Sequence, residues 1–247
     1  MIARKSVLII TTKLIDGGLG YLGLFFIARY MNPADYGIVS FAMGFVTLFT
    51  IFCSLGFTQA HIKRVSEGKN LGRCIGTYIS IKLLFLTLAT IILFASLYFW
   101  TNVIGRGFET PDHLAAIYII VGFWIFQQII ESFSSTYKAR KEIAKYELPY
   151  LLNAIVRTSA IIYVALSGMG ALALAWTYVA GVIAHLGIVL LFFRNYPIEK
   201  PTKDYLKSYS IFAFLLMLVT TSSVIMHNLD KVMIQLFWNA ADVGYYF

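Results

Sequence analysis

The stretch MGALALAWTYVAGVIAHLGIVLLFF, residues Met169–Phe193, contains no Asp, Glu, Lys or Arg. A helix needs about 20 predominantly apolar residues to cross the hydrocarbon core of a bilayer, and this stretch exceeds that length. Its apolar residues do not alternate with polar ones, as they would in a strand of a membrane barrel. The stretch therefore predicts a transmembrane helix.

Six further apolar runs of similar length lie along the chain. They are Ser6–Ala28, Ile38–Ala60, Ile75–Trp100, Leu114–Ser135, Leu148–Leu166 and Ser210–Phe237. Because backbone groups in lipid have to be hydrogen-bonded within their own segment, each run is expected to form one continuous helix. The sequence thus predicts an all-α integral membrane protein with seven transmembrane helices.

Composition supports this fold class and excludes several others. The chain has 247 residues, of which 59% are hydrophobic and only 13% charged, and its mean hydropathy is +0.76. Soluble domains carry about 25% charged residues, so a soluble enzyme and a disordered chain are excluded. Cys53 and Cys74 stand in no metal-binding or redox spacing, and no nucleotide-binding loop occurs. We expect no metal, no cofactor, no nucleic-acid partner and no enzymatic activity.

The basic residues between the spans fall almost entirely on one side. The loops of the opposite side hold only Arg29 and Arg106. This asymmetry places the N-terminus and the basic loops in the cytoplasm of a multi-pass protein of the cell membrane. The basic loop residues are Arg4, Lys5, Lys63, Arg64, Lys69, Arg73, Lys138, Arg140, Lys141, Lys145, Arg194, Lys200, Lys203 and Lys207.

A short pattern occurs twice on the outer side. Tyr30–Gly37 reads YMNPADYG and Phe237–Gly244 reads FWNAADVG, and the two are separated by a constant 207 residues. Secondary transporters are commonly built from internal repeats. Residues 1–208 are then a six-helix lobe with its cytoplasmic linker, and residues 209–247 are the first helix of an incomplete second lobe. We expect residues 1–247 to need a C-terminal lobe as partner for transport.

Several motifs resemble those of one transporter family. They are Asp16–Gly20 (DGGLG), Ile27–Gly37 (IARYMNPADYG), Asn228–Lys231 (NLDK) and Ala241–Tyr245 (ADVGY). The chain resembles the polysaccharide-biosynthesis, O-antigen-transporter-like flippases of the multidrug/oligosaccharidyl-lipid/polysaccharide (MATE-like) superfamily. The resemblance implies two lobes around a cavity that opens alternately to each side. It also implies a lipid-linked oligosaccharide as cargo, moved from the cytoplasmic to the outer leaflet.

Charged residues inside the spans are the candidate cavity residues, since each costs about 2.5–3.5 kcal/mol at mid-helix. Lys13 and Asp16 share a helix face, so they form either an intrahelical ion pair or a pair facing the cavity. Arg157, with Asn153 one turn away, is expected to face the cavity within reach of Asp16 or of a cargo phosphate. Lys82 either lines the cavity or extends toward the interface.

The other polar residues of the spans can be explained by packing or by a position at the membrane interface. Glu131 is interpreted as interfacial and His185 as a packed histidine. Asp230 and Lys231 form either a gate between the lobes or an interfacial cluster. Lys13, Lys82 and Arg157 outnumber Asp16, and this excess of positive charge favours an anionic head group such as a phosphate.

Two other functions stay open at this point. A cation-coupled multidrug exporter of the same superfamily would have an acidic cavity, whereas this chain favours a basic one. A membrane-embedded glycosyl or acyl transferase would need a polar loop with acid–base geometry, whereas the loops here are short and basic.

Overall fold

A computed structural model of the chain describes residues 2–104, 108 and 110–246, in which all regular structure is helical. Arg106, assigned above to an outer loop, lies outside these residues. The helices are α1 (Ile2–Tyr30), α2 (Pro33–Leu48), α3 (Thr50–Ser54), α4 (Phe57–Ser66), α5 (Leu71–Phe99), the π-helical turn η1 (Trp100–Ile104), α6 (Pro111–Ala139), α7 (Ile143–Leu166), α8 (Ala171–Phe193), α9 (Lys203–Phe237) and α10 (Ala240–Tyr246).

Six of the described helical segments are long and apolar enough to cross a membrane. They are Ala3–Tyr30, Pro33–Cys53, Leu71–Val103, Pro111–Ala139, Ile143–Leu166 and Ala171–Phe193. The protein is therefore an all-α, multi-pass membrane protein. The 35-residue helix α9 is not among the six. The count of seven spans stays a prediction.

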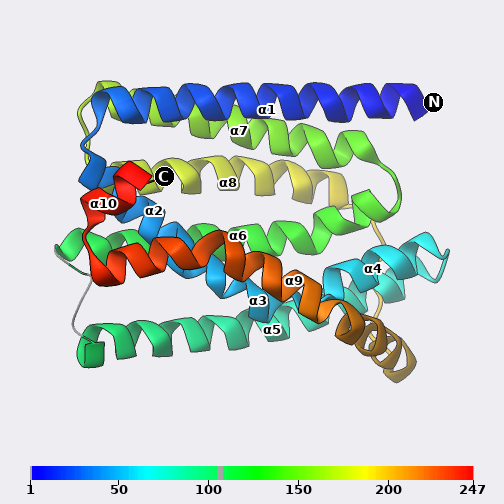
Figure 1. The fold of residues 1–247 in the computed structure, drawn as a ribbon. Helices are drawn as coiled ribbons and strands as arrows, with labels where there is room; N and C mark the ends of the chain where they lie inside the picture. The colour runs from blue at the N-terminus through cyan, green and yellow to red at the C-terminus, as the bar shows by residue number, and fades with distance from the viewer. Residues whose placement is uncertain (1, 105–107, 109, 247) are drawn as a thin grey trace.

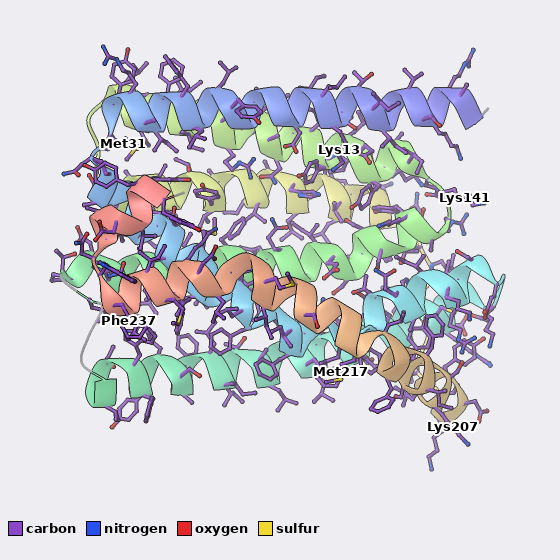
Figure 2. All side chains as sticks on the ribbon, in the orientation of Figure 1. Lys13, Met31, Lys141, Lys207, Met217 and Phe237 are labelled. Carbon is purple, nitrogen blue, oxygen red and sulfur yellow. The ribbon has the colours of Figure 1, made fainter. Side chains whose placement is uncertain are left out.

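The long helices lie side by side in a bundle (Figure 1). Helix α1 packs on α7, α7 on α8 and α8 on α6, while α2 packs on α6 and α5 lies at the far edge. Helix α9 crosses the bundle over α2 and α4. The N-terminus, Lys141 and Lys207 lie at one end, and Met31 and Phe237 lie at the other (Figures 1 and 2). We call the first end the basic end.

The second predicted span, Ile38–Ala60, is not one continuous helix, so that expectation was wrong. The chain breaks after Leu48 and again at Leu55 and Gly56, whose φ angles are 34° and 78°. Two consecutive left-handed residues cannot continue a right-handed helix. A Cβ atom on Gly56 would also overlap the carbonyl oxygen of Ala213, so the backbone of α9 packs directly against the break.

The Asn-Pro-Ala-Asp turn that follows α1 starts two helices. Asn32 Oδ1 accepts a hydrogen bond from the backbone N–H of Ala34 at 3.0 Å, and Pro33 occupies the first turn of α2. An Asn at the N-cap and a Pro in the first turn both favour a helix start. Asp35 Oδ1 accepts from the backbone N–H of Ala171 at 3.2 Å and so caps α8. This turn fixes α2 against α8 at the end opposite the basic end.

The polar linker Arg194–Lys207 is held on the start of α5. The backbone N–H of Glu199 donates to the carbonyl of Gly72 at 3.0 Å, and Arg73 pairs with the Glu199 carboxylate at 3.3 Å. A Cβ atom on Gly76 would overlap the Glu199 carbonyl oxygen. The linker therefore lies in a fixed position between α8 and α9.

At the basic end, the loop between α6 and α7 is organised around the carboxylate of Glu142. Arg140 and Lys145 pair with it at 2.7 and 2.8 Å, and the Tyr196 hydroxyl donates to it. Partial burial alone would raise the pKa of Glu142. The bonds from Lys145, Tyr196 and Arg140 outweigh burial and lower this pKa from 4.5 to about 2.

This shift predicts a pH dependence of stability. A carboxyl whose pKa is lower in the folded state stabilises the fold above its ordinary pKa, and this contribution is lost as the pH falls from 4.5 toward about 2. We expect Glu142→Gln to lower the unfolding free energy by about 1–2 kcal/mol near neutral pH, allowing for solvent screening. Thermal unfolding in detergent at several pH values should show the difference from wild type shrinking below about pH 4. A difference that is constant with pH would contradict the assignment.

Candidate functional site

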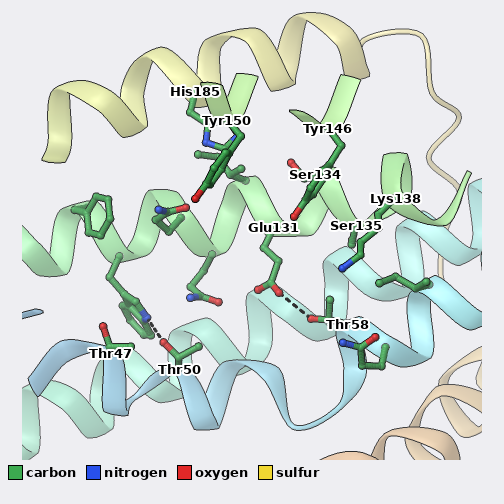
Figure 3. Close-up of a pocket in the computed structure, with 17 residues that line it drawn as sticks. Thr47, Thr50, Thr58, Glu131, Ser134, Ser135, Lys138, Tyr146, Tyr150 and His185 are labelled. Atoms are coloured by element: carbon green, nitrogen blue, oxygen red, sulfur yellow. Dashed lines mark hydrogen bonds between the residues drawn. The ribbon is translucent and has the colours of Figure 1, made fainter. Parts of the chain in front are cut away.

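A cavity of about 420 Å³ opens between α2, α3, α4, α6, α7 and α8 (Figure 3). We call it the polar cavity. It extends from Thr47 and Trp124 inside the bundle to Lys138, one residue from the basic end of α6. Its lining residues are Thr47, Thr50, Thr58, Gln59, Ile62, Phe123, Trp124, Gln127, Gln128, Ile130, Glu131, Ser134, Ser135, Lys138, Tyr146, Tyr150 and His185.

One face of α6 supplies more of the polar groups than any other helix. Residues 124, 127, 128, 131, 134, 135 and 138 all line the cavity. They recur at intervals of three and four, which places them on one side of a helix. This stripe is the sequence signal that could have located the cavity. Of its residues, only Glu131 stands out in the sequence as a charge within a span, and its position predicted an interfacial residue instead.

Buried polar atoms in the cavity wall lack a hydrogen-bond partner among the described residues. Gln128 Oε1, Ser134 Oγ and His185 Nδ1 are three of them. Buried polar atoms in proteins are nearly always hydrogen-bonded, to protein, water or ligand. Three such atoms around one open space indicate that the cavity binds a polar ligand or ordered water.

Lys82 and Glu131 form an ion pair in the cavity wall. The Lys82 ammonium lies 2.6 Å from Glu131 Oε2, and its side chain is only 1% exposed. The other carboxylate oxygen, Oε1, accepts from the Thr58 hydroxyl at 3.2 Å (Figure 3). Glu131 lines the cavity and is 38% exposed, whereas Lys82 lies behind it. The pair neutralises a lysine whose charge would be costly in this position.

Lys13 and Asp16 of α1 both interact with Tyr150, which lines the polar cavity. The Tyr150 hydroxyl donates to Asp16 Oδ2 at 3.1 Å, and the Lys13 ammonium lies 4.5 Å from the centre of the Tyr150 ring. Nearer the basic end, Thr12 donates to the buried Glu147 at 2.9 Å. Lys13 and Asp16 therefore lie behind a wall residue of the cavity rather than in its lining.

Arg157 lines a second cavity, of about 290 Å³, between α1, α2, α7 and α8. We call it the Arg157 cavity. The Arg157 guanidinium lies 5.8 Å from the centre of the Tyr178 ring, which is a cation–π distance. Among the described residues, none forms an ion pair with Arg157. Asp16 is not among the lining residues. Asn153 is buried against α8, where a Cβ atom on Gly181 would overlap its Oδ1 atom.

A family model described as polysaccharide biosynthesis protein matches residues 2–247. The chain belongs to the polysaccharide biosynthesis protein family. No curated protein and no solved structure matches the chain. Family membership and the six apolar helices together make it a membrane protein of polysaccharide biosynthesis with a role in transport.

In this member of the polysaccharide biosynthesis family, Asp230 and Lys231 lie away from both cavities. The backbone N–H of Lys231 donates to Asp230 Oδ1 at 3.0 Å. A Cβ atom on Gly44 would lie 2.9 Å from the Lys231 side chain, so the aliphatic part of that side chain packs directly on α2. Lys231 belongs to the contact between α9 and α2, and a role of Asp230 and Lys231 in gating stays a prediction.

Proposed function

We propose that the protein is a flippase, which moves a lipid-linked oligosaccharide from the cytoplasmic to the outer leaflet by alternating access. The observation that carries this proposal is the polar cavity between membrane-spanning helices, with three buried polar atoms that lack a protein partner in the described chain. Family membership supports polysaccharide precursors as the class of cargo.

The chemistry of the cavity wall suits a sugar. Hydroxyl groups of Thr and Ser and amides of Gln can both donate and accept hydrogen bonds, as sugar hydroxyls require. Trp124, Tyr146 and Tyr150 add aromatic surface. Such a combination of apolar surface and a few placed polar groups is typical of small-molecule sites.

The charges suit a cargo with a phosphate. Among the described residues that line the polar cavity, Glu131 is the only carboxylate, and Lys82 neutralises it, while Lys138 lies at the basic end of the cavity. In the Arg157 cavity, the guanidinium is free to form the bidentate bonds that phosphate accepts. A cation exporter would need an unpaired carboxylate in the polar cavity, whereas the Glu131 carboxylate is paired with Lys82.

Removing polar groups from the polar cavity should reduce export. We expect Gln128→Leu and Ser134→Leu each to lower surface polysaccharide by roughly tenfold or more, because an apolar group replaces a hydrogen-bonding one. The measurement is complementation, by the natural protein carrying each change, of a strain that lacks its flippase, with the amount in the membrane checked in parallel. Thr87→Leu, a matched change at an exposed position of α5, should keep normal export. Normal export by both cavity variants would refute this function.

A further inference from the structure

The two copies of the repeated sequence contact each other reciprocally. A Cβ atom on Gly37 would overlap the carbonyl oxygen of Ala240 and lie 3.0 Å from the Gly244 nitrogen. A Cβ atom on Gly244 would overlap the carbonyl oxygen of Pro33 and lie 3.2 Å from the Gly37 nitrogen. Pro33 and Ala240, like Gly37 and Gly244, are 207 residues apart. Each repeat thus makes the same contact on the other.

Reciprocity of this kind is the property of an isologous interface, in which two equivalent patches meet across a two-fold axis. The axis here runs between the starts of α2 and α10 and passes close to Gly37 and Gly244. The helix starts are equivalent in another respect as well. The equivalent asparagine accepts a backbone hydrogen bond at each start: Asn32 Oδ1 from the N–H of Ala34, two residues on, and Asn239 Oδ1 from the N–H of Asp242, three residues on, both at 3.0 Å. The repeat is therefore a repeat of structure, not only of sequence.

Glycines continue this contact along the first repeat. Gly44 lies two helical turns after Gly37, on the same side of α2, and packs on Lys231 of α9. Gly56 packs on the backbone at Ala213 of the same helix. We call the contact of Gly37, Gly44 and Gly56 with α9 and α10 the glycine seam. Small residues of this kind let helix backbones approach closely in membranes.

The reciprocal part of the seam lies at the end of the bundle opposite the basic end. Met31 and Phe237, one from each copy of the repeated sequence, both lie there (Figure 2), as does α10 (Figure 1). The polar cavity instead extends toward Lys138 near the basic end. If the basic end faces the cytoplasm, the polar cavity lies toward the cytoplasmic side, and the glycine seam separates it from the outer side of the membrane.

We propose that Gly37 and Gly244 form the outer closure of the transporter, and that the polar cavity reaches the outside only when α2 and α10 separate at this pair. The inference rests on the proposed alternating access. The contact is backbone against backbone, so no interlocked side chains have to repack when the helices part. A single added methyl group at either glycine is therefore enough to hold them apart.

The test measures access to the polar cavity from outside. Ser134→Cys places a thiol in the cavity, with Cys53 and Cys74 both changed to Ala, and intact cells receive a membrane-impermeant thiol reagent. We expect Gly37→Ala and Gly244→Ala each to raise labelling by roughly tenfold, because overpacking disfavours the closed state. Lys231→Ala, which removes volume from the seam, should raise it several-fold. Gly187→Ala is the control, since a Cβ atom there meets nothing within 4 Å.

Unchanged labelling in all three seam variants, at normal protein level, would overturn the proposal. If the glycine variants fail to accumulate in the membrane, Lys231→Ala decides. The labelling needs no cargo, so it can be separated from the proposed function. Raised labelling together with normal export by the Gln128→Leu and Ser134→Leu variants would support the outer closure and refute the cargo site.

Discussion

Glu131→Ala is expected to lower the unfolding free energy by about 2–3 kcal/mol, less than the cost of breaking a fully buried ion pair because the Glu131 side chain is 38% exposed. The change would leave the Lys82 ammonium, 1% exposed, without the carboxylate that now lies 2.6 Å away. It would also remove the acceptor of the Thr58 hydroxyl. Thermal unfolding in detergent and the amount of protein in the membrane both report this loss.

A double variant separates the effect of leaving Lys82 unpaired from the effect of losing the Glu131 side chain itself. Lys82→Met with Glu131→Ala removes both charges, so we expect it to recover most of the stability that Glu131→Ala loses. The exposed pair of Arg64 and Glu67 provides the control, and Glu67→Ala should cost at most about 1 kcal/mol. If the double variant is less stable than Glu131→Ala, Lys82 is not a buried charge that depends on Glu131.

Arg157→Ala should reduce export of surface polysaccharide by roughly tenfold to a hundredfold without lowering the protein level, as expected for the loss of charged hydrogen bonds to an anionic cargo. No ion pair holds Arg157 in the described part of the chain, and its side chain lines a cavity of about 290 Å³. Removing it leaves no buried carboxylate unpaired, so stability should change little. Complementation of a strain lacking its flippase provides the measurement.

Two further variants sharpen this prediction. Arg157→Lys should restore export only in part, because a point charge replaces a planar group that binds phosphate through two bonds. Arg194→Ala, at an exposed position after α8, should export normally. Full export by Arg157→Ala would remove this residue from the cargo site.

Apolar composition was enough to place most of the long helices. The stretch Met169–Phe193 corresponds to α8 (Ala171–Phe193), and Leu114–Ser135 lies within α6 (Pro111–Ala139). Helix formation in a membrane is a local requirement, since each backbone group has to find its partner within four residues. The basic loops that the sequence predicted on one side also lie at one end of the bundle (Figure 2). The order of helices and loops along the chain is enough to fix which loops share an end.

The contacts between helices could not be predicted from the sequence. Lys82 and Glu131 are 49 residues apart, and nothing local to either residue indicated that they form a pair. The break at Leu55 and Gly56 was missed because Leu55 does not favour a left-handed conformation, and the break is held by the backbone of α9 far along the chain. Such features are decided by which helix faces meet, which composition does not encode.

The repeated turn was determined partly by the sequence and partly by the tertiary structure. Its sequence alone determined that Tyr30–Gly37 and Phe237–Gly244 are equivalent and that each starts a new segment after an apolar helix. Only the tertiary structure showed that the two copies contact each other, with Gly37 and Gly244 at the point of closest approach. The physical reason is that a helix start depends on a cap and a few neighbouring residues, whereas a backbone contact across 207 residues depends on how every helix between them packs.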